Sequence, residues 1–431
     1  MTMTSEEYAR MVKRCLRCSI CKWIPQVQIK NAKHATICPS MDYYNFHAYS
    51  GGGKLILANS IETGRIPLSE TVRDIVYKCT ACGGCSVSCK HLNTLEPLEV
   101  IQLLREKLVA SGVGPMPRQQ EYIDAIKRTG NPYDEPASQR MNWLPDDVKT
   151  HDDADIAYFV GCTSSYRRKE IAIATARVLN AAGTRFKLFG SNESCCGSPV
   201  LRAGDVESFK ELVGRNIDMF TASGVKKIIA SCAGCYDMFK VEYPRFEKMP
   251  VDIVSASEYF NELIDGGKLV FKDQEPITVT YHDPCHLGRG AEPYIDWDGD
   301  VVQMLPMVSL NVPEKPKRCG AGGVYEAPRR VITRLPGVQL VEMDRIKEYS
   351  YCCGAGGGVK SAFPDFALHT GQTRITEAES TGATCIVSAC PFCSSNLQDA
   401  ITESKSQLQY KDIAELIYDS IDPSMSGQNN E

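Results

Sequence analysis

The stretches Ser194-Cys195-Cys196-Gly197 and Tyr351-Cys352-Cys353-Gly354 carry the same Cys-Cys-Gly motif and decide how the chain is organised. Each follows a single cysteine and precedes a Cys-x2-Cys pair. From the second cysteine of the motif to that pair, the distance is 36 residues in one copy and 37 in the other, which indicates an internal duplication. The two sets are Cys162, Cys195, Cys196, Cys232 and Cys235, and Cys285, Cys352, Cys353, Cys390 and Cys393.

The two copies differ in length ahead of the motif. The single cysteine lies 33 residues before Cys195 in the first copy and 67 residues before Cys352 in the second. The excess of 34 residues (67 − 33) equals the length of segment 290–323, which is rich in proline and glycine. We therefore predict that residues 290–323 are an insertion in the second copy.

Both copies alternate short β-branched or aromatic runs with amphipathic stretches, which is the order of an α/β fold. In the first copy the predicted elements are 156–161, 168–182, 185–189, 206–222 and 227–230. In the second they are 277–281, 327–335, 339–342, 364–380 and 384–388. Each copy is expected to close on a helix. Cys162 and Cys285 follow predicted strands, at the sheet edge where α/β folds place their sites.

A different cysteine pattern occupies the N-terminal region, where two runs have three cysteines at consecutive two-residue gaps. Such runs form the signature of a two-cluster ferredoxin, in which the fourth cysteine of each run binds the other cluster. We predict one 4Fe-4S cubane on Cys15, Cys18, Cys21 and Cys89, and a second on Cys79, Cys82, Cys85 and Cys38. Zinc is the alternative, although zinc ribbons rarely space three cysteines this way.

The vicinal cysteines of the duplicated modules suit a different kind of cluster. Successive side chains point in different directions along an extended chain, so a pair fits one cubane corner poorly and fits a larger or opened cluster with a bridging thiolate better. Gly197 and Gly354 permit positive φ and a close approach of the backbone. Structural zinc and inert buried thiols are the alternatives, but inert thiols have no reason to repeat at fixed spacing.

At these residues the chain resembles the heterodisulfide reductase family, and most of all its fused D type, over about residues 10–420. The resemblance implies an α-helical two-cluster ferredoxin domain followed by two α/β cysteine-rich modules, called CCG modules below. It also implies two cubane clusters and two noncubane 4Fe-4S clusters, because both modules keep all five cysteines. Iron-sulfur subunits of anaerobic glycerol-3-phosphate dehydrogenase, glycolate oxidase, lactate utilisation and benzoyl-CoA reductases share the module.

The cysteine groups and the composition between them predict the domain boundaries. We expect a ferredoxin-like domain over residues 1–110, a linker over 111–150 with one short helix near 121–128, a first CCG module over 151–270 and a second over 271–420. Residues 421–431 are expected to form a disordered tail. Cys319 and Cys385 have no counterpart in the first copy and are predicted to be ordinary thiols.

Two histidines and an arginine flank Cys285 and are the candidate catalytic residues. His282 and His286 have the ordinary pKa range for donating a proton to a leaving sulfur. A satisfied structural histidine is an equally good interpretation of each. Arg289 is a candidate for holding an anionic substrate, although arginine more often pairs with a local carboxylate.

Composition excludes several other classes of protein. A net charge of −5 over 431 residues favours neither nucleic acid nor an anionic membrane surface as a partner. The first residues lack the apolar segment of a secretory signal, and there is no run of 18 apolar residues, so a cytoplasmic location without membrane insertion is expected. Twenty cysteines in a reducing compartment indicate metal or redox work.

We therefore expect an oxidoreductase subunit that receives single electrons at its N-terminal cubanes and passes them to the noncubane clusters. There, a heterodisulfide or similar acceptor is reduced. Since the glycine runs 51–53 and 354–358 lack phosphate-loop spacing, a flavin-containing subunit, a ferredoxin or a membrane cytochrome must supply electrons. The alternatives are a pure relay to a separate catalytic subunit and a non-redox zinc assembly protein.

Overall fold

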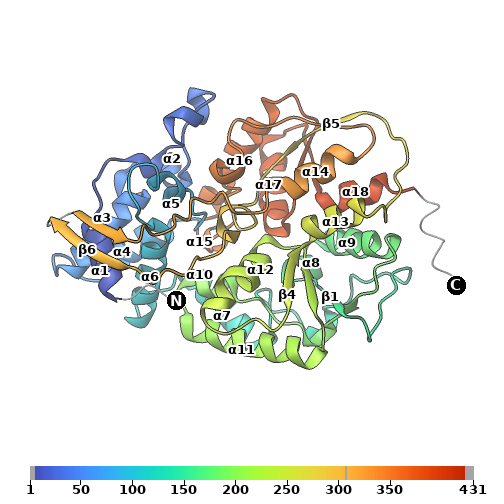
Figure 1. The fold of residues 1–431 in the computed structure, drawn as a ribbon, viewed down its shortest axis with the longest axis horizontal. Coiled ribbons are helices and arrows are strands. Elements are labelled where there is room, and N and C mark those ends of the chain that lie inside the picture. Colours follow the sequence, from blue (N-terminus) through green and yellow to red (C-terminus); the bar gives the residue numbers. More distant parts are fainter. Residues whose placement is uncertain (1–4, 306–307, 423–431) are drawn as a thin grey trace.

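The computed structural model describes residues 5–305 and 308–422, arranged as a helical N-terminal part beside two stacked α/β modules (Figure 1). The N-terminal part packs around its own apolar core, formed by residues such as Leu55, Val76 and Leu104. Its helices are α1 (Ser5–Lys13), α2 (Pro39–Tyr44), α3 (Gly51–Glu62), α4 (Glu70–Tyr77), α5 (Gly84–Cys89) and α6 (Pro97–Ala110), with four short 3-10 turns, Ile20–Lys22, Gln26–Gln28, Ala32–His34 and His47–Tyr49.

The first module is built on a four-stranded parallel sheet in the order β2-β1-β3-β4. Its strands are β1 (Ile156–Phe159), β2 (Lys187–Leu188), β3 (Lys227–Ala230) and β4 (Asp252–Ser255). Its helices are α8 (Cys162–Tyr166), α9 (Lys169–Ala181), α10 (Ser198–Ala203), α11 (Val206–Ser223), α12 (Ala233–Asp237), which continues as a π-helical turn (Met238–Glu242), and α13 (Ala256–Asp265). Strand β4 was not predicted from the sequence, and neither was its counterpart in the second module, β10 (Gln409–Asp412).

The second module repeats this architecture with a parallel sheet in the order β10-β9-β5-β8. Its strands are β5 (Ile277–Tyr281), β8 (Val338–Leu340), β9 (Cys385–Ser388) and β10 (Gln409–Asp412). Its helices are α14 (Glu326–Arg334), α15 (Val359–Ala362), α16 (Pro364–Glu379), α17 (Pro391–Ser404) and α18 (Ile413–Ser420). The predicted mixed fold, a helical N-terminal domain followed by duplicated α/β modules, is therefore confirmed.

The duplication extends to the register of the strands. In the first module Tyr158 pairs with Ile229, three residues before Cys232, and in the second Tyr281 pairs with Val387, three residues before Cys390. The equivalent residues of the two modules therefore occupy the same places in both sheets. By the same alignment, His282 corresponds to Phe159.

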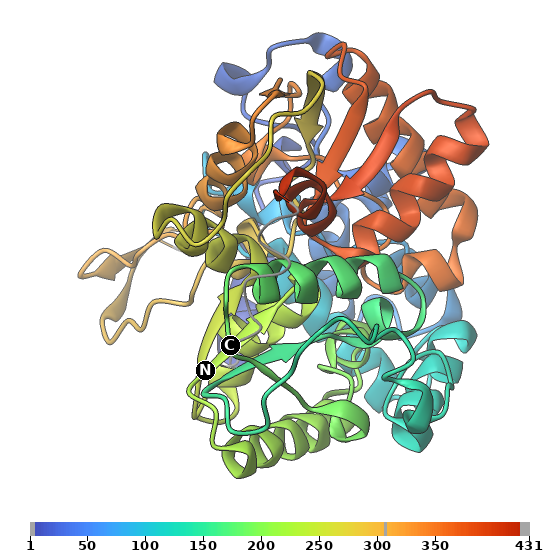
Figure 2. The same cartoon turned by 90° about the vertical axis from the view of Figure 1, so that its right-hand side faces the viewer.

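An approximate twofold axis relates the two modules, which share one continuous apolar core. Helix α9 of the first module packs against α18 of the second, and the equivalent helix α14 packs against α13. The green and red modules in Figures 1 and 2 meet along these helices. Such a self-complementary arrangement brings equivalent ends of the two sheets together.

Arg105 joins all three parts of the chain. Its side chain lies fully buried on α6 and donates hydrogen bonds to the backbone oxygens of Cys79 at 2.7 Å, Arg202 at 2.6 Å and Gly357 at 3.1 Å. Those carbonyls belong to the N-terminal part, the first module and the second module. A buried guanidinium needs such acceptors, and satisfying them fixes the relative positions of the parts.

The segment predicted to be a linker is folded against the first module. It contains α7 (Pro117–Thr129), which begins at a proline and ends at Gly130 in the left-handed conformation. The oxygen of Gly130 accepts a hydrogen bond from the Cys195 N–H at 2.7 Å. At the other end of the chain, Ile421 is buried and bridges Phe271, and residues 423–431 of the predicted tail lie outside the described residues.

The predicted insertion, residues 290–323, contains an antiparallel hairpin of β6 (Asp300–Leu305) and β7 (Val308–Val312) that projects from the body in Figure 2. Five apolar side chains of the hairpin are exposed, namely Val302, Met304, Leu305, Leu310 and Val312. Within the part of the chain that the structure describes, no helix is both long and apolar enough to cross a membrane.

Candidate metal centres

The cysteines of the first N-terminal run share a site with the last cysteine of the second run. The Cys21 thiol interacts with those of Cys15 and Cys18, and the Cys89 thiol interacts with Cys18 and Cys21. Burial and these neighbours raise the pKa of Cys21 in the metal-free chain. The structure thus groups these four sulfurs, while their ligation of a cluster remains a prediction.

Cys38 groups with the remaining three cysteines of the second run, Cys79, Cys82 and Cys85. Its thiol interacts with Cys79 and Cys82, and the Cys85 thiol interacts with Cys38, Cys79 and Cys82. Burial raises the pKa of Cys85 well above its ordinary value, and the neighbouring thiols add to this effect. Each run therefore contributes its distant cysteine to the other group.

Three consecutive glycines let α3 begin between these two groups. The Gly52 N–H donates to the Cys21 sulfur at 3.1 Å. A Cβ at Gly51 would lie 2.7 Å from Cys85 Cβ, and one at Gly53 would lie 2.0 Å from the oxygen of His47. Because these three glycines have no side chains, the N-terminus of α3 can lie between the two cysteine groups.

In the first CCG module five thiols converge. The Cys162 thiol interacts with that of Cys195. The Cys196 thiol interacts with those of Cys195 and Cys235, and the Cys235 thiol also interacts with that of Cys232. The Cys195 and Cys235 thiols lower the pKa of Cys196 to about 6.

The second module repeats the arrangement. The Cys285 thiol interacts with that of Cys352. The Cys353 thiol interacts with those of Cys352 and Cys393, and the Cys393 thiol also interacts with that of Cys390. The Cys352 and Cys393 thiols lower the pKa of Cys353 well below its ordinary value.

The four groups adjoin one another in series. Cys85 of the second N-terminal group interacts with Cys21 of the first. Cys82 then contacts Cys352 of the second module, and the Cys352 thiol with burial raises the pKa of Cys82. Finally, Cys390 contacts Cys232 of the first module. The cysteine groups therefore follow one another from the N-terminal part through the second module to the first.

Sheet topology explains why cysteines separated in sequence converge. In the strand order 2-1-3-4, the connections after the first and third strands leave in opposite directions, and a crevice opens at the carboxyl ends of these strands. Cys162 and Cys232 follow β1 and β3 in the first module. Cys285 and Cys390 follow β5 and β9 in the second. Cys232 and Cys390 also precede α12 and α17 directly, where the helix dipole favours a thiolate.

Gly197 and Gly354 meet a strict requirement next to the paired cysteines. Both have positive φ, +82° and +97°, and their N–H groups donate to the sulfurs of Cys195 at 3.4 Å and Cys352 at 3.3 Å. A Cβ at Gly197 would lie 2.6 Å from the Phe209 ring, and one at Gly354 would lie 2.4 Å from a backbone oxygen. No other residue type fits either position without distortion.

Arg140, from the predicted linker, reaches the first five-cysteine group and was not identified from the sequence. Its guanidinium lies 3.5 Å from the Cys162 sulfur and pairs with the Glu193 carboxylate at 2.7 Å. Burial opposes the charge, but Cys162 and Glu193 outweigh it and raise the pKa of Arg140. The nearest sequence signal is Glu193, a lone acid two residues before Cys195.

His282 and Arg289 are both buried, and protein groups occupy most of their polar atoms. The His282 Nδ1 accepts a hydrogen bond from Arg374 Nε at 3.1 Å, and burial, followed by the Arg374 charge, lowers the pKa of His282 to about 3. Arg289 donates to the backbone oxygens of Cys82, Glu348 and Ser350. The Nη2 of Arg289 has no partner among the described residues.

His286 forms a dyad with an aspartate of the other module. Its Nδ1 lies 2.7 Å from the Asp237 carboxylate, which also pairs with Arg202 at 2.8 Å. Burial works against ionisation, but Arg202 and His286 outweigh it and hold the pKa of Asp237 below its ordinary value. The imidazole therefore has a fixed orientation beside Cys285.

A cavity of about 40 Å³ adjoins this dyad and draws on every part of the chain. Its lining includes Cys82 of the N-terminal part, Arg202 of the first module, Cys285 and His286 of the second, and Arg318 of the insertion. The insertion thus lies beside the second five-cysteine group. Arg318 also stacks on Tyr294 at 3.9 Å.

The donor sets fit iron-sulfur clusters. All twenty cysteines are free thiols, and eighteen belong to the four groups, so soft sulfur donors dominate each site. A buried polar atom, His282 Nε2, has no partner among the described residues and lies at the second CCG site. Of the remaining two cysteines, Cys385 is buried within β9 and Cys319 is half-buried.

Comparisons with known proteins define the class of protein. Residues 11–92 match the model of a 4Fe-4S dicluster domain, and residues 156–240 and 317–398 match that of a cysteine-rich domain. With the geometry above, these matches define an iron-sulfur oxidoreductase subunit that binds 4Fe-4S clusters through a ferredoxin-like domain and two CCG modules.

The chain belongs to the heterodisulfide reductase family, among its D-type subunits. It is 36% identical over 416 residues to the D-type subunit of dihydromethanophenazine:CoB--CoM heterodisulfide reductase from Methanosarcina mazei, covering 94% of this chain and 93% of that protein. It is also 28% identical to a probable iron-sulfur-binding oxidoreductase, FadF, of Bacillus subtilis and to the EtfAB:quinone oxidoreductase of Syntrophomonas wolfei. The matches cover 93% and 80% of this chain, and 53% and 46% of those two proteins.

Substituting Gly354 tests the geometry of the second five-cysteine group. We expect Gly354→Ala to lower the iron bound per chain, because a left-handed alanine costs about 1–2 kcal/mol and its Cβ would also meet a backbone oxygen. Gly382→Ala is the control, since Gly382 has a similar φ of +77° but open space around it. Iron analysis after anaerobic purification measures both, and wild-type iron in Gly354→Ala would contradict the assignment.

Proposed function

We propose that this chain takes single electrons at its N-terminal cysteine groups and delivers them to the two CCG modules, where a disulfide is reduced. The observation that carries the proposal is that the four cysteine groups adjoin in series: Cys21 and Cys85 interact electrostatically, Cys82 contacts Cys352, and Cys390 contacts Cys232. A redox path needs such closely spaced carriers. The name of the Methanosarcina mazei relative, a heterodisulfide reductase subunit, supports the same acceptor class.

The cofactors in this proposal are two cubane and two noncubane 4Fe-4S clusters. Cys15, Cys18, Cys21 and Cys89 would hold one cubane, and Cys38, Cys79, Cys82 and Cys85 the other. Each set of five CCG cysteines would hold one noncubane cluster. When bound, these clusters supply one-electron transfer over a wide range of potentials. The glycines at each site let the backbone approach closely enough to donate N–H groups to sulfur.

Reduction of a disulfide consumes two electrons and two protons and releases two thiols. The contact between Cys232 and Cys390 places the two CCG groups side by side, so two one-electron centres can serve one acceptor. A disulfide bond also needs a proton source near the departing sulfur. We propose that the interface between the modules meets both requirements.

His286 is the proposed proton donor. Asp237 fixes its Nδ1 at 2.7 Å, which leaves Nε2 for the cavity beside Cys285. The second histidine, His282, is instead buried, with its Nδ1 bonded to Arg374. Arg289 is the proposed contact for an anionic group of the acceptor, through its Nη2. The other two arginines of the cavity, Arg202 and Arg318, are balanced by the carboxylates of Glu96, Glu99, Glu242 and Glu292 in the same lining.

A pure electron relay is the second candidate function. The cavity beside Cys285 is small, with a volume of about 40 Å³, which favours electron transfer through the chain over binding of an organic disulfide in it. The chain would then pass electrons between a flavin-containing partner and a separate catalytic subunit. The name of the EtfAB:quinone oxidoreductase relative, an enzyme that acts between EtfAB and a quinone, supports a relay. A ferredoxin or a membrane cytochrome is the other class of donor. In either case we propose a cytoplasmic location, with any membrane contact through a partner.

Assay of the anaerobically purified chain with reduced methyl viologen and organic disulfides separates the two functions. Disulfide reduction predicts two viologens oxidised and two thiols released for each disulfide consumed. If the clusters accept electrons from viologen but no disulfide yields thiol, the relay function holds and the reductase proposal fails.

Replacing His286 tests the proton donor. We expect His286→Gln to lower the rate of disulfide reduction by about 10²–10⁴-fold, the usual contribution of a positioned acid. Reduction of the clusters by viologen, followed by EPR, should be unchanged, because the substitution removes a proton and leaves the cysteines in place. His369→Gln, at an exposed position on α16, is the control and should keep the wild-type rate. An unchanged rate in His286→Gln would reject the role.

A further inference from the structure

We propose that His282 donates a hydrogen bond from its Nε2 to a sulfur of the cluster in the second CCG module. His282 would then set the reduction potential of that cluster. The inference rests on the proposed function, in which Cys353 and Cys393 bind a cluster. It concerns a residue outside the five cysteines.

The position of His282 leads to this role. Its side chain is buried, with 1% of its surface exposed, directly after β5. One of its ring nitrogens and the sulfurs of Cys353 and Cys393 all lie within 4.8 Å of one another. Nδ1 is bonded to Arg374, whereas Nε2 has no partner among the described residues. A buried, unpaired nitrogen is costly unless something at this site accepts its bond.

Arg374 decides which nitrogen carries the proton. A guanidinium has only donors, so the His282 Nδ1 must use its lone pair to accept the bond from Arg374 Nε at 3.1 Å. In the neutral imidazole the hydrogen is then on Nε2. A protonated Nε2 has no lone pair for iron, so this nitrogen acts as a donor to sulfur and not as a metal ligand.

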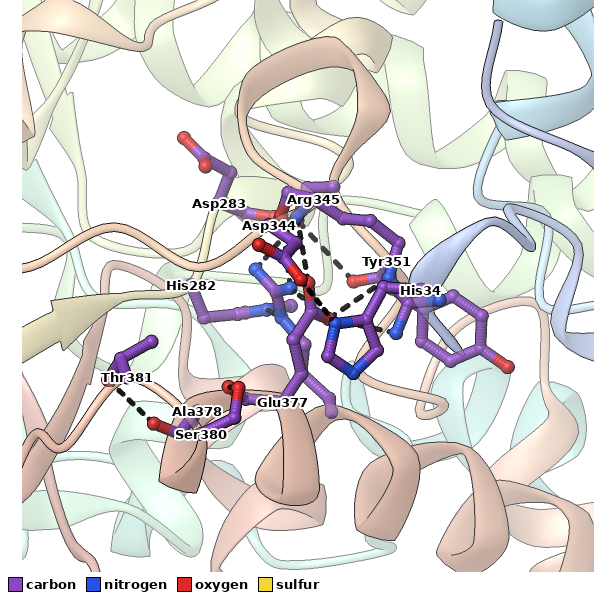
Figure 3. A network of polar contacts seen from close by, with 12 residues as sticks. His34, His282, Asp283, Asp344, Arg345, Tyr351, Glu377, Ala378, Ser380 and Thr381 are labelled. Atoms are coloured by element: carbon purple, nitrogen blue, oxygen red, sulfur yellow. Dashed lines mark hydrogen bonds and ion pairs between the residues drawn. The ribbon is translucent and has the colours of Figure 1, made fainter. Parts of the chain in front are cut away.

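A buried polar network holds Arg374 in place, and Figure 3 labels three of its members, His282, Arg345 and Glu377. Arg374 donates to the Glu377 carboxylate at 2.7 Å and to the Arg345 backbone oxygen at 3.0 Å. Arg345 pairs with the same carboxylate and also donates to the oxygen of Thr36 at 2.8 Å. The network therefore connects His282 to the N-terminal segment that leads to Cys38.

The first module provides an internal comparison. By strand register and by distance to the single cysteine, the equivalent of His282 is Phe159. Phe159 is fully buried and packs edge-to-face on Phe239 at 4.8 Å. A phenylalanine ring offers no N–H to a sulfur. The duplicated sites are thus chemically unequal at this position.

A hydrogen bond to sulfur stabilises the reduced, more negative cluster and so raises its potential. Removing the donor should lower the potential of the second CCG cluster alone. His282→Phe is the variant of choice, because it copies a residue that the same position of the first module accommodates. We expect at least about a tenfold change in the redox equilibrium, or about 59 mV for one electron.

The test is an EPR-monitored redox titration of wild type and His282→Phe, with iron analysis of both. The potentials of the N-terminal clusters in the same sample, and an exposed-site variant, His369→Phe, serve as controls and should not move. Pulsed EPR on wild type labelled with [¹⁵N]histidine needs no substitution. It should show a weak nitrogen coupling in the second-module signal.

Unchanged potential with full iron content in His282→Phe would overturn the inference. So would the absence of a histidine coupling in labelled wild type, or a strong coupling typical of a nitrogen bound to iron. If wild type lacks a second-module cluster altogether, the proposed function fails and the inference fails with it. If His282→Phe loses iron, the pulsed EPR measurement on labelled wild type decides whether His282 has this role.

Discussion

The contact between Cys232 and Cys390 is the constraint on which the rest of the structure depends. Each thiol begins a helix at the carboxyl end of a central strand, and the approximate twofold axis between the modules brings the two together. The two five-cysteine groups consequently adjoin each other through this pair. Buried thiols contribute little more than small apolar side chains, so their convergence here makes sense through metal binding. The packing of α9 on α18 and of α13 on α14 serves to maintain this meeting point.

Buried arginines hold the N-terminal part against that interface. Arg105 donates to carbonyls of all three parts, Arg289 to the backbone of Cys82 and Ser350, and Arg345 to Thr36. Each joins a segment beside an N-terminal cysteine group to a segment beside Cys352. Charged groups bonded to backbone oxygens resist displacement, because breaking the bonds leaves a buried charge unsatisfied. This is how contacts such as Cys82–Cys352 persist without a covalent link.

Much of this arrangement was predictable from the sequence, because cysteine spacing and strand periodicity are local signals. The steps of 36 and 37 residues indicated the duplicated modules, and the runs at Cys15 and Cys79 indicated the ferredoxin part. The groups that depend on tertiary contact were not predictable. Arg140, Asp237 and Arg374 lie far in sequence from the cysteines or histidines they contact. Strands β4 and β10 were missed because each leads directly into a helix, with no loop between them to mark the end of the strand.

The most direct test of the account is the iron and acid-labile sulfide content, with EPR, of anaerobically purified wild type, Cys353→Ala and Cys385→Ala. Cys385 is also buried in the second module but lies outside the five-cysteine group, so it is the matched control. The account predicts about sixteen irons in wild type and in Cys385→Ala, and about four fewer in Cys353→Ala. About eight irons in all three proteins would contradict it, leaving a ferredoxin domain attached to two modules without clusters.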